Sequence, residues 1–265
     1  MTPAELERYL REELDAFPGR AALLAAEAGG GHVLHAAAPD VQVVSASTVK
    51  VPILCAALEL CRRGDLDLEQ LVPIPEDRIC PDTRVFEAGN RREEGYPLWE
   101  LLYWMTALSD NTATNAVIRL LGFGAVNDWC RAQGLEQTKL EREMLDWDAI
   151  AAGRNNYTSP ADQCRVYRLL YGEEILTSEL RETAMDFLRR QRHMDGLLRY
   201  IPDNVPVAHK GGSLDHLDHD AGLFLLPRRP YFVGIFTWDG AGTEEDPTRR
   251  RFIGRLSKAI YQTYR

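Results

Sequence analysis

The sequence predicts an α/β protein of the α+β type. One antiparallel sheet is formed by both chain ends and flanked by terminal helices, and an all-helical subdomain is inserted between them. Strand-like apolar segments near both ends and helix-like apolar spacing in the middle are the observations behind this prediction. We expect one domain, 1–265, with a sheet subdomain at about 1–45 and 203–265 and a helical subdomain at about 46–202.

The N-terminal part of the chain predicts a helix followed by a hairpin. In "MTPAELERYLREELDAFPGR" the residues Leu6, Leu10, Leu14 and Phe17 fall on one face of an amphipathic helix. Charges throughout this segment do not fit a secretory signal. The next segment, "AALLAAEAGGGHVLHAAA", predicts two short strands that turn at the three glycines of 29–31.

The remaining segments predict helices and then strands. "LWELLYWMTALSDNTATNAVIRLLG" has apolar residues at helix spacing, with Gly122 and Gly124 as stops. "VPVAHKGGS", "AGLFLLP" and "RPYFVGIFTW" return to strand character. "TRRRFIGRLSKAIYQTYR" closes the chain as an amphipathic helix whose apolar face holds Phe252, Ile253, Leu256 and Ile260.

Composition excludes some partners and indicates a compartment. The net charge of −9 argues against general affinity for nucleic acid or an anionic membrane. No apolar run approaches the roughly 18 residues of a spanning helix. The five cysteines are an odd number without a Cys-x-x-Cys pair, which indicates free thiols in a reducing compartment. We expect a cytoplasmic monomer, or an exported protein if a leader was removed.

Three polar signals interrupt this apolar pattern, and the first is in "VVSASTVKVPILCAAL". Ser47 and Lys50 open a stretch that predicts a buried helix, and Pro52 fits only in its first turn. A serine cap followed by a lysine that extends to solvent would give the same pattern. This pair alone therefore does not indicate catalysis.

The second and third signals are equally ambiguous when each is taken alone. "ALSDNTATNA" contains Ser109, Asp110 and Asn111, all of residue types that favour helix starts. "VAHKGGSLD" ends a predicted strand at Lys210, before Gly211 and Gly212, as a glycine turn would.

Together, in this order, Ser-x-x-Lys, Ser-Asp-Asn and Lys-x-Gly resemble the motifs of class A β-lactamases and penicillin-binding proteins. The resemblance extends over nearly the whole chain and includes the split sheet. It implies that Ser47 is the nucleophile and Lys50 its activating partner. Ser109 and Asn111 take the roles of the second motif, and Lys210 that of the third.

The chemistry of such a site requires a base for the serine. Lys50 can take the proton only as a neutral amine, so burial and the like charge of Lys210 should lower its pKa. The resemblance further implies that Ser109 relays a proton to the leaving nitrogen and that Asn111 holds the substrate amide. Backbone N–H groups of Ser47 and Ser213 would bind the oxyanion. Gly212 is also assigned to substrate binding, because extended substrate would lie along the strand after Lys210.

Two departures from the family pattern concern substrate binding and release of the acyl group. Gly211 stands where the family usually has Thr or Ser, so a hydroxyl for a substrate carboxylate is missing. His219, in "SLDHLDHDAG", could partly compensate, although a solvated turn explains the same letters. His216 and His219 with nearby aspartates only weakly suggest a metal site, and we expect no metal and no other cofactor.

The loop "LEREMLDWDAIAAGRNNYTSPAD" is where the resemblance places the carboxylate that activates the deacylating water. Glu143 stands about where that glutamate belongs, but Trp147 occupies the place of its partner asparagine. Glu141 and Asp146 lie close by in the sequence, so a surface charge is an equal alternative for Glu143.

The sequence thus predicts a serine hydrolase that works through an acyl-enzyme on Ser47. β-Lactam hydrolysis is the first choice, and a D-Ala-D-Ala peptidase or an esterase or amidase is the alternative. A β-lactam-binding sensor that is acylated without turnover is a candidate from another class. The partner in each case is a small molecule, either a β-lactam or an acyl-peptide or ester.

Overall fold

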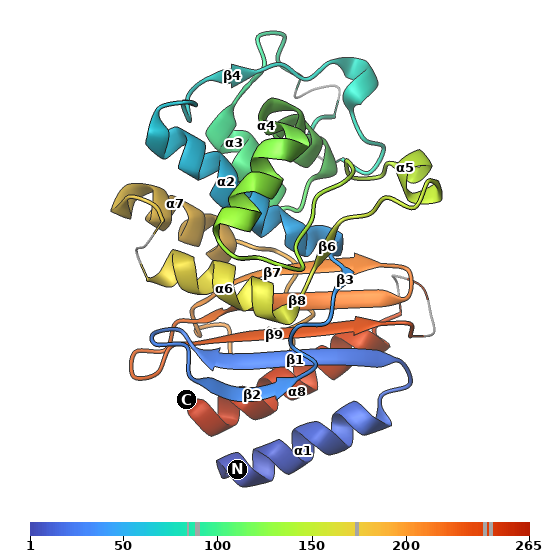
Figure 1. The fold of residues 1–265 in the computed structure, drawn as a ribbon, viewed down its shortest axis with the longest axis vertical. Helices are drawn as coiled ribbons and strands as arrows, with labels where there is room; N and C mark the ends of the chain where they lie inside the picture. Colours follow the sequence, from blue (N-terminus) through green and yellow to red (C-terminus); the bar gives the residue numbers. More distant parts are fainter. Residues whose placement is uncertain (84, 88–90, 173–174, 241–242, 244–245) are drawn as a thin grey trace.

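The computed structural model describes residues 1–83, 85–87, 91–172, 175–240, 243 and 246–265. Its centre is an antiparallel sheet of five strands in the order β2-β1-β9-β8-β7. The strands are β1 (Arg20–Glu27), β2 (Val33–Ala37), β7 (Val207–Leu214), β8 (Leu217–Phe224) and β9 (Tyr231–Trp238). The pairing of β1 with β9 joins the two chain ends in one sheet, as predicted (Figure 1).

Two terminal helices cover one face of this sheet (Figure 1). They are α1 (Pro3–Ala16) and α8 (Thr248–Tyr264). The leucines predicted on the apolar face of α1 pack here, Leu6 and Leu10 fully buried, and so do all four apolar residues predicted for α8. The prediction of terminal helices and an N-terminal hairpin is confirmed, because the apolar spacing in these segments directs one face to the sheet.

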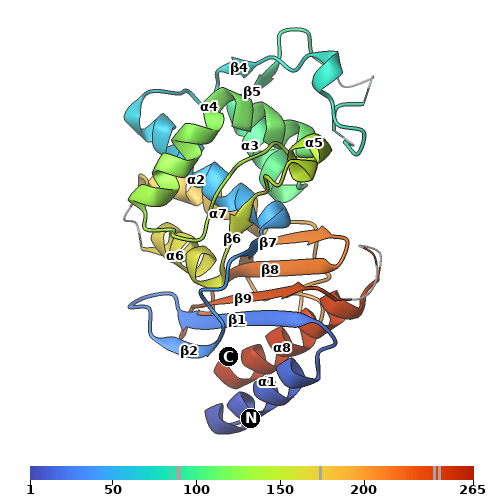
Figure 2. The same cartoon turned by 45° about the vertical axis from the view of Figure 1, so that its right-hand side comes forward.

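The middle of the chain forms a helical layer against the other face (Figure 2). Its helices are α2 (Lys50–Arg63), α3 (Leu98–Ala107), α4 (Asn111–Ala132), α5 (Trp147–Ala151), α6 (Pro160–Tyr171) and α7 (Ser178–Arg189). Short pairs join β3 (Val43–Val44) to β6 (Tyr157–Thr158) and β4 (Leu71–Val72) to β5 (Tyr96–Pro97), and the 3₁₀ turns are η1 (Ala46–Val49) and η2 (Glu76–Arg78). The proposed subdomain boundaries stay a prediction.

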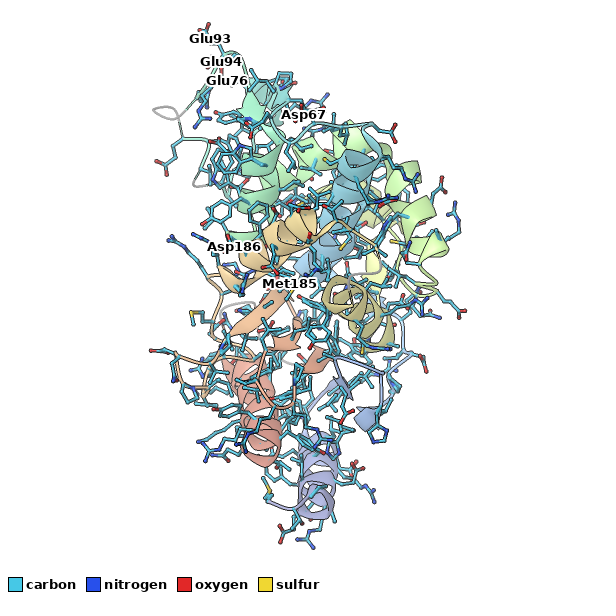
Figure 3. All side chains as sticks on the ribbon, turned by 90° about the vertical axis from the view of Figure 1, so that its left-hand side faces the viewer. Asp67, Glu76, Glu93, Glu94, Met185 and Asp186 are labelled. Atoms are coloured by element: carbon cyan, nitrogen blue, oxygen red, sulfur yellow. The ribbon has the colours of Figure 1, made fainter. Side chains whose placement is uncertain are left out.

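Acidic side chains extend from the end of this helical layer that is farthest from the chain termini. Figure 3 shows Glu76, Glu93 and Glu94 at that end. Among the described helices, none is long and apolar enough to cross a membrane.

Helix α4 differs from its prediction at the two glycines. Gly122 adopts φ 76° and ψ 151°, so the chain kinks there, and helical structure resumes and continues to Ala132. Gly124 lies inside this second part and does not end it. A glycine can take up such a backbone conformation without strain, and here it redirects a helix without ending it.

A buried ion pair connects helix α8 to strand β8. Arg249 donates from Nε to Asp218 Oδ2 at 2.7 Å, and both side chains are 1% exposed. The other carboxylate oxygen of Asp218 accepts from the Ser213 hydroxyl at 2.6 Å. Burial raises the pKa of Asp218, while its hydrogen bonds to Ser213 and Arg249 oppose the rise. These contacts therefore fix the side chain of Ser213, near the end of β7.

We expect Arg249→Met to lower the free energy of unfolding by about 3 kcal/mol, because the buried Asp218 carboxylate loses its hydrogen-bonded cation and keeps, among the described cations, only Arg250, at 3.9 Å. Chemical denaturation followed by circular dichroism measures this loss. Arg251→Met, at an exposed position of the same helix, is the control and should change stability by less than about 0.5 kcal/mol. Equal losses in the two variants would contradict this role of the ion pair.

Candidate active site

Ser47 lies in the 3₁₀ turn η1, directly before α2 begins at Lys50. Its side chain is partly exposed, whereas Lys50 is fully buried. Ala46 has φ 45°, a left-handed conformation that is costly for a residue with a Cβ. The chain thus turns sharply just before Ser47, and the expected position of this serine at the start of the helix is observed.

Strand β7 comes very close to the backbone of Ser47. A Cβ atom added to Gly212 would lie 2.6 Å from the Ser47 nitrogen and 3.0 Å from the Ala46 Cβ. Only glycine allows this approach, which brings the end of β7 beside Ser47.

Gly211 is different, because an added Cβ would make only ordinary contacts. The nearest atoms would be the His219 carbonyl oxygen at 3.5 Å and Asp220 Cγ at 3.6 Å. The neighbour of Gly211 is therefore a carboxylate, which pairs with the ring of His209 at 2.9 Å. The position has room for a Cβ atom but carries no hydroxyl.

Two buried lysines meet at the hydroxyl of Ser109. Lys50 Nζ donates to the Ser109 carbonyl oxygen at 2.7 Å and to Asn111 Oδ1 at 2.8 Å, and it lies 3.1 Å from Ser109 Oγ. Lys210 Nζ lies 3.0 Å from the same Oγ and donates to the Gly211 carbonyl oxygen at 2.7 Å. The structure thus brings together residues of all three sequence motifs.

Burial is the main cause of the unusual acidity of both lysines. It lowers the pKa of Lys50 to about 7, although Asp110, Asp82 and Cys80 act in the opposite direction. It also lowers the pKa of Lys210 well below its ordinary value, helped by the charge of Lys50 and opposed by Asp220. Because charge repulsion is mutual, two lysines on one hydroxyl resist being protonated together.

Asp110 explains why the second motif also looks like a helix cap. Its Oδ1 accepts from the backbone N–H of Ala113 at 2.9 Å, at the N-terminus of α4. Its Oδ2 accepts from the Thr83 hydroxyl at 2.6 Å. The capping interpretation is therefore right for Asp110, while its two neighbours contact Lys50.

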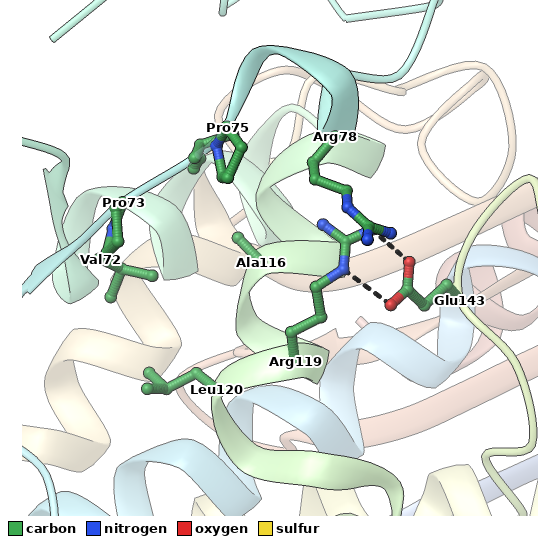
Figure 4. Close-up of a pocket in the computed structure, with 9 residues that line it drawn as sticks. Val72, Pro73, Pro75, Arg78, Ala116, Arg119, Leu120 and Glu143 are labelled. Atoms are coloured by element: carbon green, nitrogen blue, oxygen red, sulfur yellow. Dashed lines mark hydrogen bonds and ion pairs between the residues drawn. The ribbon is translucent and has the colours of Figure 1, made fainter. Parts of the chain in front are cut away.

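Glu143 lies in a different setting from the one predicted. Its carboxylate forms a two-point ion pair with Arg119, with Nε to Oε1 at 2.8 Å and a second contact from Nη2 to Oε2. This pair lies in a pocket that is also lined by Val72, Pro73, Pro75, Arg78, Ala116 and Leu120 (Figure 4).

Within the described part of the chain, no hydrogen bond or ion pair joins Glu143 to Ser47, Lys50 or Lys210. The arginine holds both carboxylate oxygens, which weighs against a role in activating water. The catalytic assignment of Glu143 stays a prediction. Trp147, in the place of the expected asparagine, is 64% exposed.

His219 is buried behind the site and does not face a solvated turn. Its Nε2 lies 2.8 Å from the Val44 carbonyl oxygen, and its Nδ1 accepts from the Thr237 N–H at 3.2 Å. Burial lowers its pKa to about 4, so the ring is neutral near pH 7. Because backbone groups contact both ring nitrogens, His219 connects β8 to β3, and its role in substrate binding stays a prediction.

His216 and the cysteines bear on the predictions of a metal site and of free thiols. The described residues contain no group of three or more His, Cys, Asp or Glu side chains that could hold a metal ion. His216 instead lies 3.1 Å from the Gly240 carbonyl oxygen. All five cysteines are free, and burial raises the pKa values of Cys130 and Cys164 to about 12.

Asp82 is a residue at the site that the sequence motifs did not predict. This exposed residue follows η2, and its Oδ2 accepts from Asn111 Nδ2 at 2.6 Å. A lone aspartate in a loop carries no pattern that would connect it to a helix start far along the chain. Only the folded structure places it at the site.

A serine at a helix start, a buried lysine of lowered pKa and a second serine between two lysines form the arrangement expected of a serine hydrolase of the acyl-enzyme class. The model of the β-lactamase enzyme family matches residues 5–264. The chain therefore belongs to the β-lactamase enzyme family.

Three similar proteins illustrate this membership. The extended-spectrum β-lactamase PER-1 of Pseudomonas aeruginosa is 25% identical over 82% of this chain and 73% of its own length. The structure of PBP-A is similar with a TM-score of 0.85 at 25% identity, covering 97% of this chain and 95% of that one. The ancestral class A β-lactamase GNCA has the same fold, with a TM-score of 0.88 at 23% identity over 98% and 100% of the two chains.

We expect Lys50 to lose its proton near pH 7, because its ammonium group is fully buried. NMR of protein labelled with ¹³C-lysine should show one ε-carbon signal that titrates with a midpoint near this value. Lys50→Arg should remove that signal and so assign it. A Lys50 signal that stays unchanged between about pH 6 and 8 would contradict the expected shift.

Proposed function

We propose that this protein is a serine β-lactamase that acts through an acyl-enzyme on Ser47. The observation that carries the proposal is the buried Lys50, whose pKa is lowered to about 7, at the start of the helix that follows Ser47. A lysine with such a pKa is partly neutral at physiological pH and can accept a proton. Membership of the β-lactamase enzyme family supports the same reaction.

Acylation follows from these positions. Neutral Lys50 takes the proton of the Ser47 hydroxyl as its oxygen attacks the substrate carbonyl carbon. Ser109, between the two lysines, then passes a proton to the leaving nitrogen. Among the described residues the Ser47 hydroxyl has no hydrogen-bond partner, and such contacts often tighten only when substrate binds.

The oxyanion and the substrate chain would be held by backbone groups. The Ser47 N–H lies at the beginning of the helical segment, where the positive end of the helix dipole favours negative charge. The Ser213 N–H is its proposed partner, since Gly212 brings β7 beside Ser47. Asn111 is the proposed donor to the side-chain amide of the substrate.

Release of the acyl group is the step that we propose to be slow. Arg119 forms an ion pair with the Glu143 carboxylate, and Gly211 has no hydroxyl that could bind a substrate carboxylate. A variant of the similar PBP-A was captured as an acyl-enzyme complex with penicillin G. We therefore propose rapid acylation of this protein by β-lactams, followed by slow hydrolysis of the ester.

A peptidase is the second candidate, and the position of β7 favours it. β7 is the edge strand of the sheet, so an extended acyl-peptide could pair with its free side next to Ser47. In either case we propose that the protein acts as a monomer on a small molecule. The cytoplasm stays the proposed compartment.

We expect a fluorescent penicillin to label the protein covalently and Ser47→Ala to abolish the label. The reason is that the acyl group has no other attachment point in the proposed mechanism. Intact mass spectrometry and gel fluorescence measure the adduct, and circular dichroism checks that the variant is folded. Labelling of folded Ser47→Ala protein would refute the assignment, whereas unlabelled wild-type protein would refute reaction with penicillins.

We expect Glu143→Gln to change the lifetime of the penicillin adduct by less than about threefold, because Arg119 already holds the carboxylate. Stopped-flow measurement of the burst and of the steady rate tests this. If the carboxylate does activate the deacylating water, the variant should instead accumulate adduct and its steady rate should fall by about 100-fold or more.

A further inference from the structure

The amide of Asn111 is bound at both ends, and its outer partner is a carboxylate. Its Oδ1 accepts from Lys50 at 2.8 Å, and its Nδ2 donates to Asp82 Oδ2 at 2.6 Å. A carboxylate can only accept, so the NH₂ group must face Asp82 and the oxygen must face the lysine. The amide orientation is therefore fixed by its two neighbours.

Asp82 is held in this place by contacts on both sides of it. The Cys80 N–H donates to Thr112 Oγ1 at 2.9 Å, and the Thr83 hydroxyl donates to Asp110 Oδ2 at 2.6 Å. Both acceptors belong to the start of α4, which also carries Asn111. The exposed carboxylate is thus fixed on the same helix terminus as the amide that it contacts.

The second hydrogen of the Asn111 NH₂ group is left for a substrate. Under the proposed function, this N–H donates to the carbonyl oxygen of the side-chain amide. Asp82 Oδ2 and that carbonyl oxygen then accept from the same NH₂ group, and no described cation forms an ion pair with the carboxylate. A substrate with only apolar groups there would leave this carboxylate without a partner.

We infer that Asp82 determines specificity by binding a protonated amine on the carbon next to the substrate's side-chain carbonyl, while the carbonyl itself binds Asn111. The preferred substrates are therefore α-amino acyl compounds. This inference rests on the proposed acylation of Ser47 and adds the class of side chain that the site selects.

The electrostatics of the site connect this recognition to catalysis. The negative charge of Asp82 is one of the groups that raise the pKa of Lys50 against the effect of burial. The ammonium group of a substrate bound to Asp82 would offset that charge. It would thereby favour neutral Lys50, the form that accepts the proton. The correct substrate would thereby increase the fraction of active base.

Ampicillin and benzylpenicillin test the inference, because they differ only in the α-amino group. We expect the second-order rate constant of acylation, measured by stopped flow and intact mass, to be about tenfold higher for ampicillin with the wild-type protein. Asp82→Asn keeps the size and an oxygen acceptor for Asn111 but removes the charge. This variant should bring the ratio of the ampicillin to the benzylpenicillin rate constant close to one, mainly by slowing acylation by ampicillin.

A pH series adds a result that a structural role alone would not give. Removing the Asp82 charge should shift the pH dependence of acylation by benzylpenicillin, so that its midpoint lies at lower pH. The reason is that Lys50 then loses its proton more easily. Glu94→Gln removes one charge at the far end of the helical layer (Figure 3) and should change neither the ratio nor the midpoint.

The outcomes separate this inference from the proposed function. Equal ampicillin-to-benzylpenicillin ratios in wild type and Asp82→Asn, with both penicillins acylating Ser47, would overturn the role of Asp82 and leave the function standing. The same loss in Glu94→Gln would show a general charge effect and would also overturn it. Acylation by neither penicillin would overturn the proposed function and this inference with it.

Discussion

The site depends on two buried lysines that share the hydroxyl of Ser109. Each ammonium group is fully buried, and each lies about a hydrogen-bond length from the same oxygen. Burial and mutual repulsion make protonation of both unfavourable, so the pair favours a neutral amine beside Ser109. Desolvation of these amines costs free energy, and the surrounding fold must provide that free energy.

Three separate elements have to meet for this arrangement to exist. The turn η1 and α2 place Ser47 and Lys50, the start of α4 places Ser109, and β7 brings Lys210. Asp110 fixes the start of α4 by capping it. Gly212 lets β7 approach η1 more closely than any other residue would allow. The strain at the backbone of Ala46 and Ser109, both with positive φ, is concentrated where these elements meet.

The two carboxylates outside this centre have different surroundings and therefore different proposed roles. Arg119 pairs with Glu143, so its oxygens are occupied and its charge is neutralised. Within the described part of the chain, the hydrogen bond of Asp82 is to the neutral amide of Asn111, and its carboxylate lies at the exposed side of the site. A substrate therefore meets the charge of Asp82 and not that of Glu143.

The sequence by itself determined most of the elements and which residues are candidates for the reaction. Apolar spacing located the terminal helices, the hairpin and the last strands, because burial of one face imposes a period on the residues. Three short motifs, taken together, singled out Ser47, Lys50, Ser109, Asn111 and Lys210 as candidates, because each motif keeps its residues within one turn or strand end.

Only the tertiary structure decided how residues distant in the sequence meet. The pairing of Glu143 with Arg119, the burial of His219 against Val44 and the contact of Asp82 with Asn111 all join separate segments. No local period or spacing predicts such contacts, because they arise from the packing of separate segments against one another. The charge and access of these groups, and hence their proposed roles, follow from that packing.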